Sequence, residues 1–227
     1  LYYYTFSKIS RSSHLILGWI YFIAAWLSLF LVNGIIAFML TPGRWIETGS
    51  FWHGFFNPSM FPSLFFRTAV ALVLAGVYGF VTASFIKKTQ LRDKMIRYCA
   101  RWLLLPFAFM ILFAVWYVLA LPEDIRAMVL ERSPETAFYG KLFIALLAVL
   151  FCGGLLMAVR MPHAVKKPMA FFMLAVGLFY LGSFEFIREA GRRPYLIAGH
   201  MFSNSIEPGD TGRINKTGIL KTAKWNQ

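Results

Sequence analysis

The run FYGKLFIALLAVLFCGGLLMAV, residues 138–159, contains a single charged side chain, Lys141, in 22 positions. A bilayer core of about 30 Å is crossed by roughly 20 helical residues, so this run is long enough to span a membrane. Four more runs of the same kind occupy about residues 14–40, 60–86, 102–121 and 168–187. The sequence therefore predicts an all-α, polytopic membrane bundle of about five transmembrane helices.

The overall composition favours contact with lipid over contact with nucleic acid. Of the 227 residues, 59% are hydrophobic and 15% are charged, whereas soluble domains are nearer half apolar and a quarter charged. The net charge of +13 is distributed over short stretches between the apolar runs. Basic loops of this kind are the ordinary topology signal of membrane proteins. We therefore expect the lipid bilayer, and no nucleic acid, as a partner.

The charges of the connections predict an orientation. The connections after the second and fourth runs are basic, as is the N-terminal segment, whereas the connection after the third run is acidic, with Glu123, Asp124, Glu131 and Glu135. By the positive-inside rule the N-terminus lies in the cytoplasm and the C-terminal tail outside. The basic residues are Lys8, Arg11, Lys87, Lys88, Arg92, Lys94, Arg97, Arg101, Arg160, His163, Lys166 and Lys167.

Two segments outside the apolar runs have their own character. Residues 41–59 are rich in Trp and Phe among Gly, Ser and Pro, which predicts an interfacial segment on the outer surface. Residues 199–227 are polar and have little apolar periodicity. We expect this tail to lie on a partner or to be loosely ordered, apart from a membrane domain over residues 1–198.

Ionisable side chains inside or next to the apolar runs need partners, because each costs roughly 3 kcal/mol or more near the bilayer centre. They are Arg67, Lys141, Glu185 and Glu189, and three arginines, Arg188, Arg192 and Arg193, follow closely. Glu185 and Glu189 are four residues apart and share a helix face. They could pair with the arginines and anchor the helix. Alternatively, a carboxylate here binds a metal or haem iron, or carries protons.

The histidines and cysteines give little support for a haem held by this chain alone. None of the four histidines, His14, His53, His163 and His200, lies in the middle of a predicted span, so a bis-histidine haem is not expected. His53 and His200 could ligate a group at the outer surface, although solvation is the more ordinary role. Cys99 and Cys152 form no Cys-x-x-Cys or haem-attachment pattern, which excludes a c-type haem on this chain.

The run FIREAGRRPY, residues 186–195, resembles the signature that closes subunit I of cytochrome bd-type oxidases. In that family a Glu-x-Gly-Arg-Gln-Pro-Trp run ends a late helix near the outer surface. Here Arg193 stands in place of the Gln and Tyr195 in place of the Trp. The run LVNG, residues 31–34, followed by FNP, residues 56–58, is similar to the family's fourth helix and the outer loop into its fifth.

The resemblance implies that the chain corresponds to the later helices of a split subunit I, with the early helices supplied by a separate membrane subunit. Glu189 matches the glutamate that ligates the high-spin b haem, and Arg192 matches an arginine beside the haem propionates. The positions of the low-spin haem ligands hold Arg67 and Phe143, so this second haem is expected to be absent. We expect Arg67 to be buried against a propionate or a partner's carboxylate.

The resemblance also implies an unusual entry for electrons. In place of the family's quinol-binding loop only a short basic turn, Lys87 to Arg101, is expected. The hypothesis is a subunit of a respiratory complex in a bacterial or archaeal inner membrane, inactive alone, with high-spin haem b shared with partner helices. The family implies oxygen reduction, and a c-type cytochrome on the lysine-bearing outer tail would be the electron donor. The candidate cofactor-binding residues are Glu189, Arg192, Glu185 and Arg67.

Two other functions fit parts of the sequence. A haem-free structural subunit that anchors peripheral redox proteins would use Glu185, Glu189 and Arg67 for ion pairs between helices. A small transporter would also explain buried charges, but it predicts Gly- or Pro-broken helices in corresponding halves of the chain, and the sequence shows no such pattern.

Overall fold

The computed structural model describes residues 2–131, 134–159, 162–193, 195–203 and 206–217, without the side chains of residues 128, 130, 131, 134, 135 and 215. Helices dominate, and five of them are long and apolar enough to cross a membrane, which confirms the predicted all-α membrane bundle and fits a multi-pass protein. These five are α2 (Arg11–Leu40), α5 (Met60–Ser84), α6 (Thr89–Ala120), α8 (Pro134–Val159) and α9 (Lys167–Arg192).

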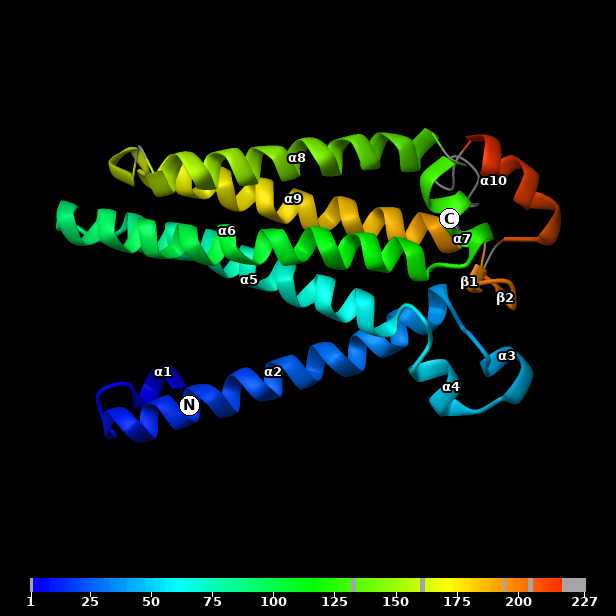
Figure 1. The fold of residues 1–227 in the computed structure, drawn as a ribbon, viewed down its shortest axis with the longest axis horizontal. Coiled ribbons are helices and arrows are strands. Elements are labelled where there is room, and N and C mark those ends of the chain that lie inside the picture. The colour runs from blue at the N-terminus through cyan, green and yellow to red at the C-terminus, as the bar shows by residue number, and fades with distance from the viewer. Residues whose placement is uncertain (1, 132–133, 160–161, 194, 204–205, 218–227) are drawn as a thin grey trace, which may run out of the picture.

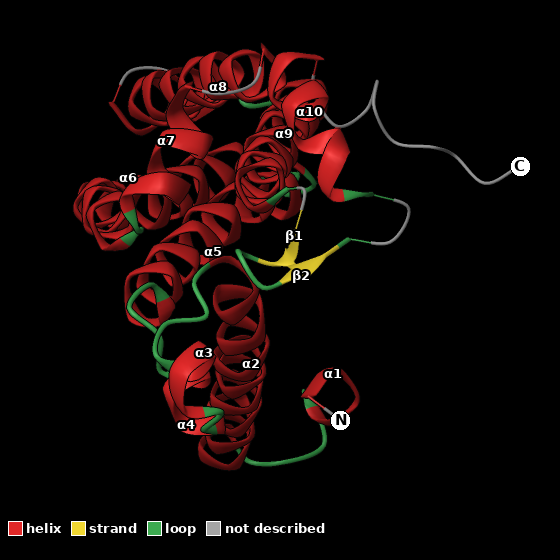
Figure 2. Ribbon diagram, turned by 90° about the vertical axis from the view of Figure 1, so that its right-hand side faces the viewer, coloured by secondary structure: helices red, strands yellow, loops and turns green. Residues whose placement is uncertain are grey.

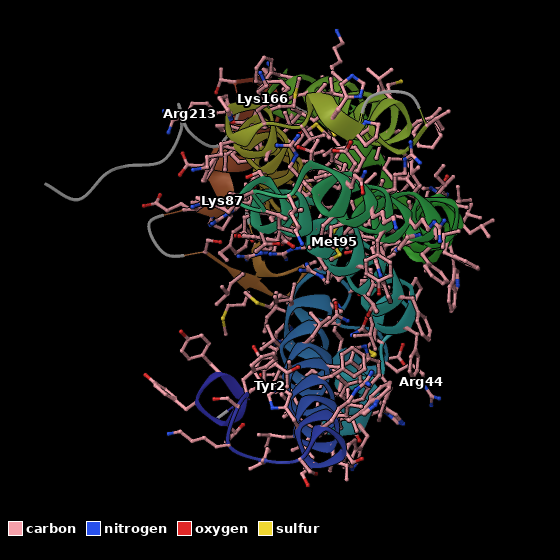
Figure 3. All side chains as sticks on the ribbon, turned by 90° about the vertical axis from the view of Figure 1, so that its left-hand side faces the viewer. Tyr2, Arg44, Lys87, Met95, Lys166 and Arg213 are labelled. Atoms are coloured by element: carbon pink, nitrogen blue, oxygen red, sulfur yellow. The ribbon has the colours of Figure 1, made fainter. Side chains whose placement is uncertain are left out.

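The short elements gather at the two ends of the bundle, as Figure 1 shows. One end, which we name the basic end, holds the α5–α6 turn at Lys87 and Lys88 and the α8–α9 turn at Lys166 and Lys167. There the Lys167 Nζ lies 4.3 Å from the ring centre of Phe85. Figure 3 looks onto this end. Its elements are α1 (Tyr2–Thr5) and the 3-10 turn η1 (Pro162–Ala164).

The opposite end, which we name the motif end, is where α9 finishes at Arg192. Its elements are α3 (Trp45–Thr48), α4 (Phe51–Phe55), α7 (Glu123–Glu131), the antiparallel strands β1 (Tyr195–Ile197) and β2 (Met201–Phe202), the 3-10 turn η2 (Pro208–Asp210) and α10 (Thr211–Thr217). Of the charges used for orientation, Arg160 lies outside the described residues, as do the side chains of Glu131 and Glu135.

The core lies where α5 crosses α6, with α8 and α9 packed against the pair. Small residues make the crossing close: a Cβ added at Gly76 would lie 2.7 Å from the Leu103 backbone nitrogen and 2.8 Å from the Cys99 carbonyl oxygen. Close approach through small residues is the usual way for helices to associate in a membrane, where burial of apolar surface gives little driving force.

Helix α6 begins thirteen residues before the expected start of the third span, at Thr89, so the basic turn expected over Lys87–Arg101 is wrong in its extent. Good helix formers fill this segment, and Ile96, Cys99 and Ala100 are buried at helical spacing against α5. At 1.5 Å per residue the 32 residues of α6 extend about 48 Å, beyond a bilayer core of about 30 Å. A prediction based only on the length of the apolar run therefore starts the helix too late, after its charged first turns.

Helix α2 packs on the bundle through its C-terminal half, where Trp26 Nε1 donates to Thr68 Oγ1 of α5 over 3.2 Å and Leu29 and Phe30 are partly buried. From residue 15 to residue 32 it contains no buried residue, although the stretch is almost wholly apolar. Beyond it Asn33, Gly34, Ala37 and Leu40 are buried. Figure 1 shows the N-terminal part of α2 diverging from α6, α8 and α9, while its C-terminal end reaches the bundle. This long apolar face requires lipid or another helix as its environment.

The segments outside the long helices contain short helices and a β-hairpin. Residues 41–59 contain α3 and α4, with Phe51 and Trp52 exposed as an interfacial segment requires. Within the described part of the tail, β2 pairs with β1 in a hairpin, and η2 and α10 follow (Figure 2). Just before the tail, the amide of Ala198 donates to the carbonyl of Met39 in α2 over 3.0 Å. Residues 218–227, with Lys221 and Lys224, lie outside the described part of the chain.

Candidate functional site

The last two turns of α9 carry alternating charges on one helix face. Glu185, Arg188, Glu189 and Arg192 follow one another at spacings of three, one and three residues, and the helix continues through Arg192 rather than ending near Ile187. The Nε of Arg188 donates to Glu185 Oε2 over 3.0 Å, and the Nε of Arg192 donates to Glu189 Oε2 over 3.1 Å. Helical spacing alone therefore brings the two carboxylates and two guanidinium groups together.

Arg67 joins this group from α5. Its Nη1 donates to Glu185 Oε1, its Nη2 donates to Glu185 Oε2 over 3.1 Å, and the guanidinium lies 5.4 Å from the ring centre of Phe184. The side chain of Arg67 is 12% exposed. For Arg67 the resemblance implied a propionate or a partner's carboxylate, and the structural alternative implied ion pairs between helices. In the structure its partner is this chain's own Glu185.

Glu189, the candidate iron ligand, is the most heavily engaged carboxylate. It accepts from Arg188 Nη2 over 3.3 Å, from Arg193 Nη2 over 3.0 Å, and from both Nε and Nη2 of Arg192. Its side chain remains 32% exposed. Glu189 thus sits at the surface of the chain with its oxygens held by arginines.

Two of these arginines also fix the C-terminal hairpin. The Nη1 of Arg192 donates to the carbonyls of Tyr195 and Leu196 over 2.8 and 3.0 Å, and the Nη1 of Arg193 donates to Ser203 Oγ over 2.9 Å. The hairpin in turn bonds to α2 through Ala198. The motif therefore ties the end of α9 to the end of α2, although its Pro194 lies outside the described residues.

The second motif-bearing region lies at the same end. Asn33 Nδ2 donates to the Met60 carbonyl over 2.9 Å and its Oδ1 accepts from Ser63 Oγ over 3.1 Å, which joins α2 to the start of α5. Asn57 Oδ1 accepts from Thr41 Oγ1 over 2.8 Å. All of these side chains are buried. The residues that carry the resemblance thus meet at the motif end and hold α2, α5 and α9 together.

The charged cluster as a whole, Arg67, Glu185, Arg188, Glu189, Arg192 and Arg193, has an excess of positive charge. Four guanidinium groups face two carboxylates, a net charge of +2. Among the described residues, Arg67 Nε and Arg188 Nη1 are buried without a hydrogen-bond partner. Unpaired buried donors and uncompensated positive charge mark a place where an anionic group is favourable.

The other candidate residues lie apart from this cluster. Phe143, at the expected position of a haem-ligating Met, stacks on Tyr180 with 4.6 Å between ring centres. His53 Nδ1 and Thr48 Oγ1 are 2.8 Å apart, His200 packs on Trp45, and His14 stacks on Tyr2. Within the described residues no three His, Cys, Asp or Glu side chains gather as a metal site.

Beside the cluster is a cavity that sequence reasoning missed. It has a volume of about 480 Å³, and Arg188, Lys141 and Phe143 line it, but Glu189 does not. The only sequence signal for it was Lys141 in a run that is otherwise uncharged.

No family model, curated protein or solved structure matches the chain. The relationship to cytochrome bd-type oxidases therefore stays a prediction from the motif residues.

Proposed function

We propose that this chain is a membrane subunit of a respiratory electron-transfer complex, in which the motif end helps to bind a high-spin haem b shared with a partner subunit. The observation that supports the proposal is that both motif-bearing regions lie at one end of the bundle (Figure 1), where the end of α9 forms with Arg67 a cluster of net charge +2. A haem b carries two propionates, and an excess of guanidinium donors fits such a dianionic group.

Within this proposal Glu189 supplies a carboxylate oxygen to the iron, and Arg192, with Arg188, faces the propionates. The 32% exposure of Glu189 places it where helices of another subunit can cover the group. Its oxygens are held by three arginines, so binding iron requires the release of at least one of those hydrogen bonds. Carboxylate oxygen is a hard ligand suited to high-spin iron, and a bound haem supplies one-electron transfer.

The exposed face of α2 supports a partner subunit that contributes further helices. From residue 15 to residue 32 this helix has no buried residue, and a neighbouring helix would cover part of that surface. We further propose that the motif end faces the outside of a bacterial or archaeal inner membrane and that a c-type cytochrome delivers electrons there. Oxygen reduction is the reaction that the resemblance implies, and it requires the whole complex.

A second function is favoured by a specific observation: every carboxylate oxygen of Glu185 and Glu189 accepts a hydrogen bond from an arginine of the same chain. The two carboxylates of the cluster therefore have partners without any ligand. This arrangement fits a haem-free structural subunit that anchors peripheral redox proteins.

The two functions are separated by reduced-minus-oxidised absorption spectra of the purified complex. Glu189→Gln keeps the shape of the side chain and an oxygen that can accept from the arginines, but it is a much weaker iron ligand. Glu189→Ala is the companion variant. The proposal predicts loss of the high-spin haem signal in both, with the complex intact by gel filtration.

The matched control is Glu123→Gln, which alters an exposed carboxylate in the first turn of α7, at the same end of the bundle and outside the cluster. It should leave the high-spin signal in place. Unchanged spectra for an intact Glu189→Gln complex would eliminate Glu189 as the ligand, and a wild-type complex without any haem signal would establish the structural function instead.

A further inference from the structure

The cavity at the motif end is apolar over most of its wall. Helices α6, α8 and α9 supply most of the lining, and α7 closes one side with Val129. The volume of about 480 Å³ lies within the roughly 300–1,000 Å³ of ligand pockets. The apolar lining includes Leu40, Phe66, Ala114, Phe143, Ile144 and Phe184.

The polar groups of the cavity are few, and they come from the start of α8 and the end of α9. Thr136 lies in the first turn of α8, is 3% exposed, and its Oγ1 has no hydrogen-bond partner among the described residues. Arg188 lies one turn from the end of α9, and its buried Nη1 also lacks a partner in the described part of the chain. Lys141, an exposed residue of α8, adds a second cation to the lining. Buried polar atoms without partners are rare, so these donors indicate an absent acceptor.

We propose that this cavity binds one acyl chain of an anionic membrane phospholipid, whose phosphate accepts hydrogen bonds from Arg188 and Lys141. Guanidinium and ammonium groups are the usual donors to phosphate, and an apolar wall below them suits a hydrocarbon chain. The proposal shares Arg188 with the haem hypothesis, but neither Glu189 nor Arg192 lines the cavity, so different variants test the two. A bound lipid would satisfy Arg188 Nη1 and fill the space between α6, α8 and α9.

Gly140 offers a direct way to close the cavity. It lines the wall, and a Cβ added to it meets no atom within 4 Å, so the side chain of Gly140→Leu begins in open space beside the cavity. Gly182 in α9 is the matched control: its added Cβ also meets nothing within 4 Å, and it lies outside the cavity. Both substitutions replace a helical glycine by the same better helix former, so they differ only in the space they fill.

The experiment is native mass spectrometry of the delipidated complex, offered phosphatidylglycerol, phosphatidylcholine or inorganic phosphate in detergent. The wild type and Gly182→Leu should each retain one phosphatidylglycerol per chain, and Gly140→Leu should lose it. Lys141→Gln should weaken retention by about fivefold, the usual effect of one basic side chain on an anionic lipid.

Three outcomes would overturn the proposal. Equal retention by Gly140→Leu and the wild type means that the lipid binds elsewhere. Equal retention of phosphatidylcholine and phosphatidylglycerol means that the cations do not select an anionic head group. Displacement of the lipid by inorganic phosphate at similar concentration means that the acyl chain contributes nothing.

Discussion

Arg67 and Glu185 lie 118 positions apart in the chain, and yet two guanidinium nitrogens of Arg67 donate to the two carboxylate oxygens of Glu185. The pair joins α5 to α9 within the apolar bundle. Glu185 accepts at the same time from Arg188, whereas Arg67 has no second carboxylate partner among the described residues. Glu185 therefore has two charged partners there and Arg67 has one, so the loss of either residue should change the free energy of unfolding by a different amount.

Removal of Glu185 should destabilise the protein more than removal of Arg67. Glu185→Gln leaves Arg67 without a carboxylate partner, leaves Arg188 paired only with Glu189, and raises the net charge of the cluster to +3, whereas Arg67→Met leaves Glu185 paired with Arg188. Breaking a fully buried pair costs about 3–5 kcal/mol. Because Glu185 is 31% exposed, we expect about 2 kcal/mol for Glu185→Gln and less for Arg67→Met.

Thermal unfolding in detergent, followed by circular dichroism, measures this difference. Arg213→Ala serves as the control, because its pair with Asp210 is exposed and should contribute less than about 1 kcal/mol. A larger loss for Arg67→Met than for Glu185→Gln would contradict the assigned pairing.

The α5–α6 crossing should tolerate no side chain at Gly76. The Cβ of Gly76→Ala would meet backbone atoms of Cys99 and Leu103, which cannot move without shifting α6. Overpacking of this kind costs about 1–3 kcal/mol. By contrast, Gly182→Ala meets no atom and should raise stability by up to about 1 kcal/mol through helix propensity. Equal melting temperatures for the two variants would show that the crossing is looser than described.

Asn33 should contribute measurably to the stability of the protein at the motif end. It is 1% exposed, and its amide joins Met60 and Ser63 of α5 to α2. Asn33→Ala removes both hydrogen bonds and should cost about 1–3 kcal/mol. The neighbouring Val32 is 50% exposed, so Val32→Ala should change stability by less than about 0.5 kcal/mol. Urea unfolding of the two variants in the same detergent compares them directly, and similar midpoints would argue against the Asn33 bridge.

The number and nature of the long helices could be predicted from the sequence, because the bilayer sets the length of an apolar run. The start of α6 could not be found that way, since its first three turns are charged. A search for buried positions at helical spacing, such as Ile96, Cys99 and Ala100, would have extended it to Thr89.

The candidate site could be predicted only for the residues that lie close together in the sequence. Glu185, Arg188, Glu189 and Arg192 lie close in sequence, so their shared helix face followed from spacing alone. The pairing of Arg67 with Glu185 was implied only by the structural alternative, and no sequence pattern marks the bond from Ala198 to Met39. Both join segments far apart in the chain. The cavity depends on the packing of several helices and left only Lys141 as a signal.

The clearest measure of how the motif holds the C-terminal hairpin is the exchange rate of one amide. Arg192 is 5% exposed and donates to Glu189 and to the carbonyls of Tyr195 and Leu196. Arg192→Lys keeps the charge but lacks the planar fork, so it cannot make these bonds together. Loss of one charge-assisted bond, about 1.5–3 kcal/mol, should speed exchange of the Ala198 amide roughly tenfold or more.

Hydrogen exchange with mass spectrometry over residues 195–203 gives this rate. Arg193→Lys is the matched control: Arg193 is more exposed, and its bonds go to Glu189 and Ser203 instead of the β1 carbonyls. Its effect on the Ala198 amide should therefore be the smaller of the two. Equal protection in the wild type and Arg192→Lys would mean that α2, through Met39, holds the hairpin without help from the motif arginine.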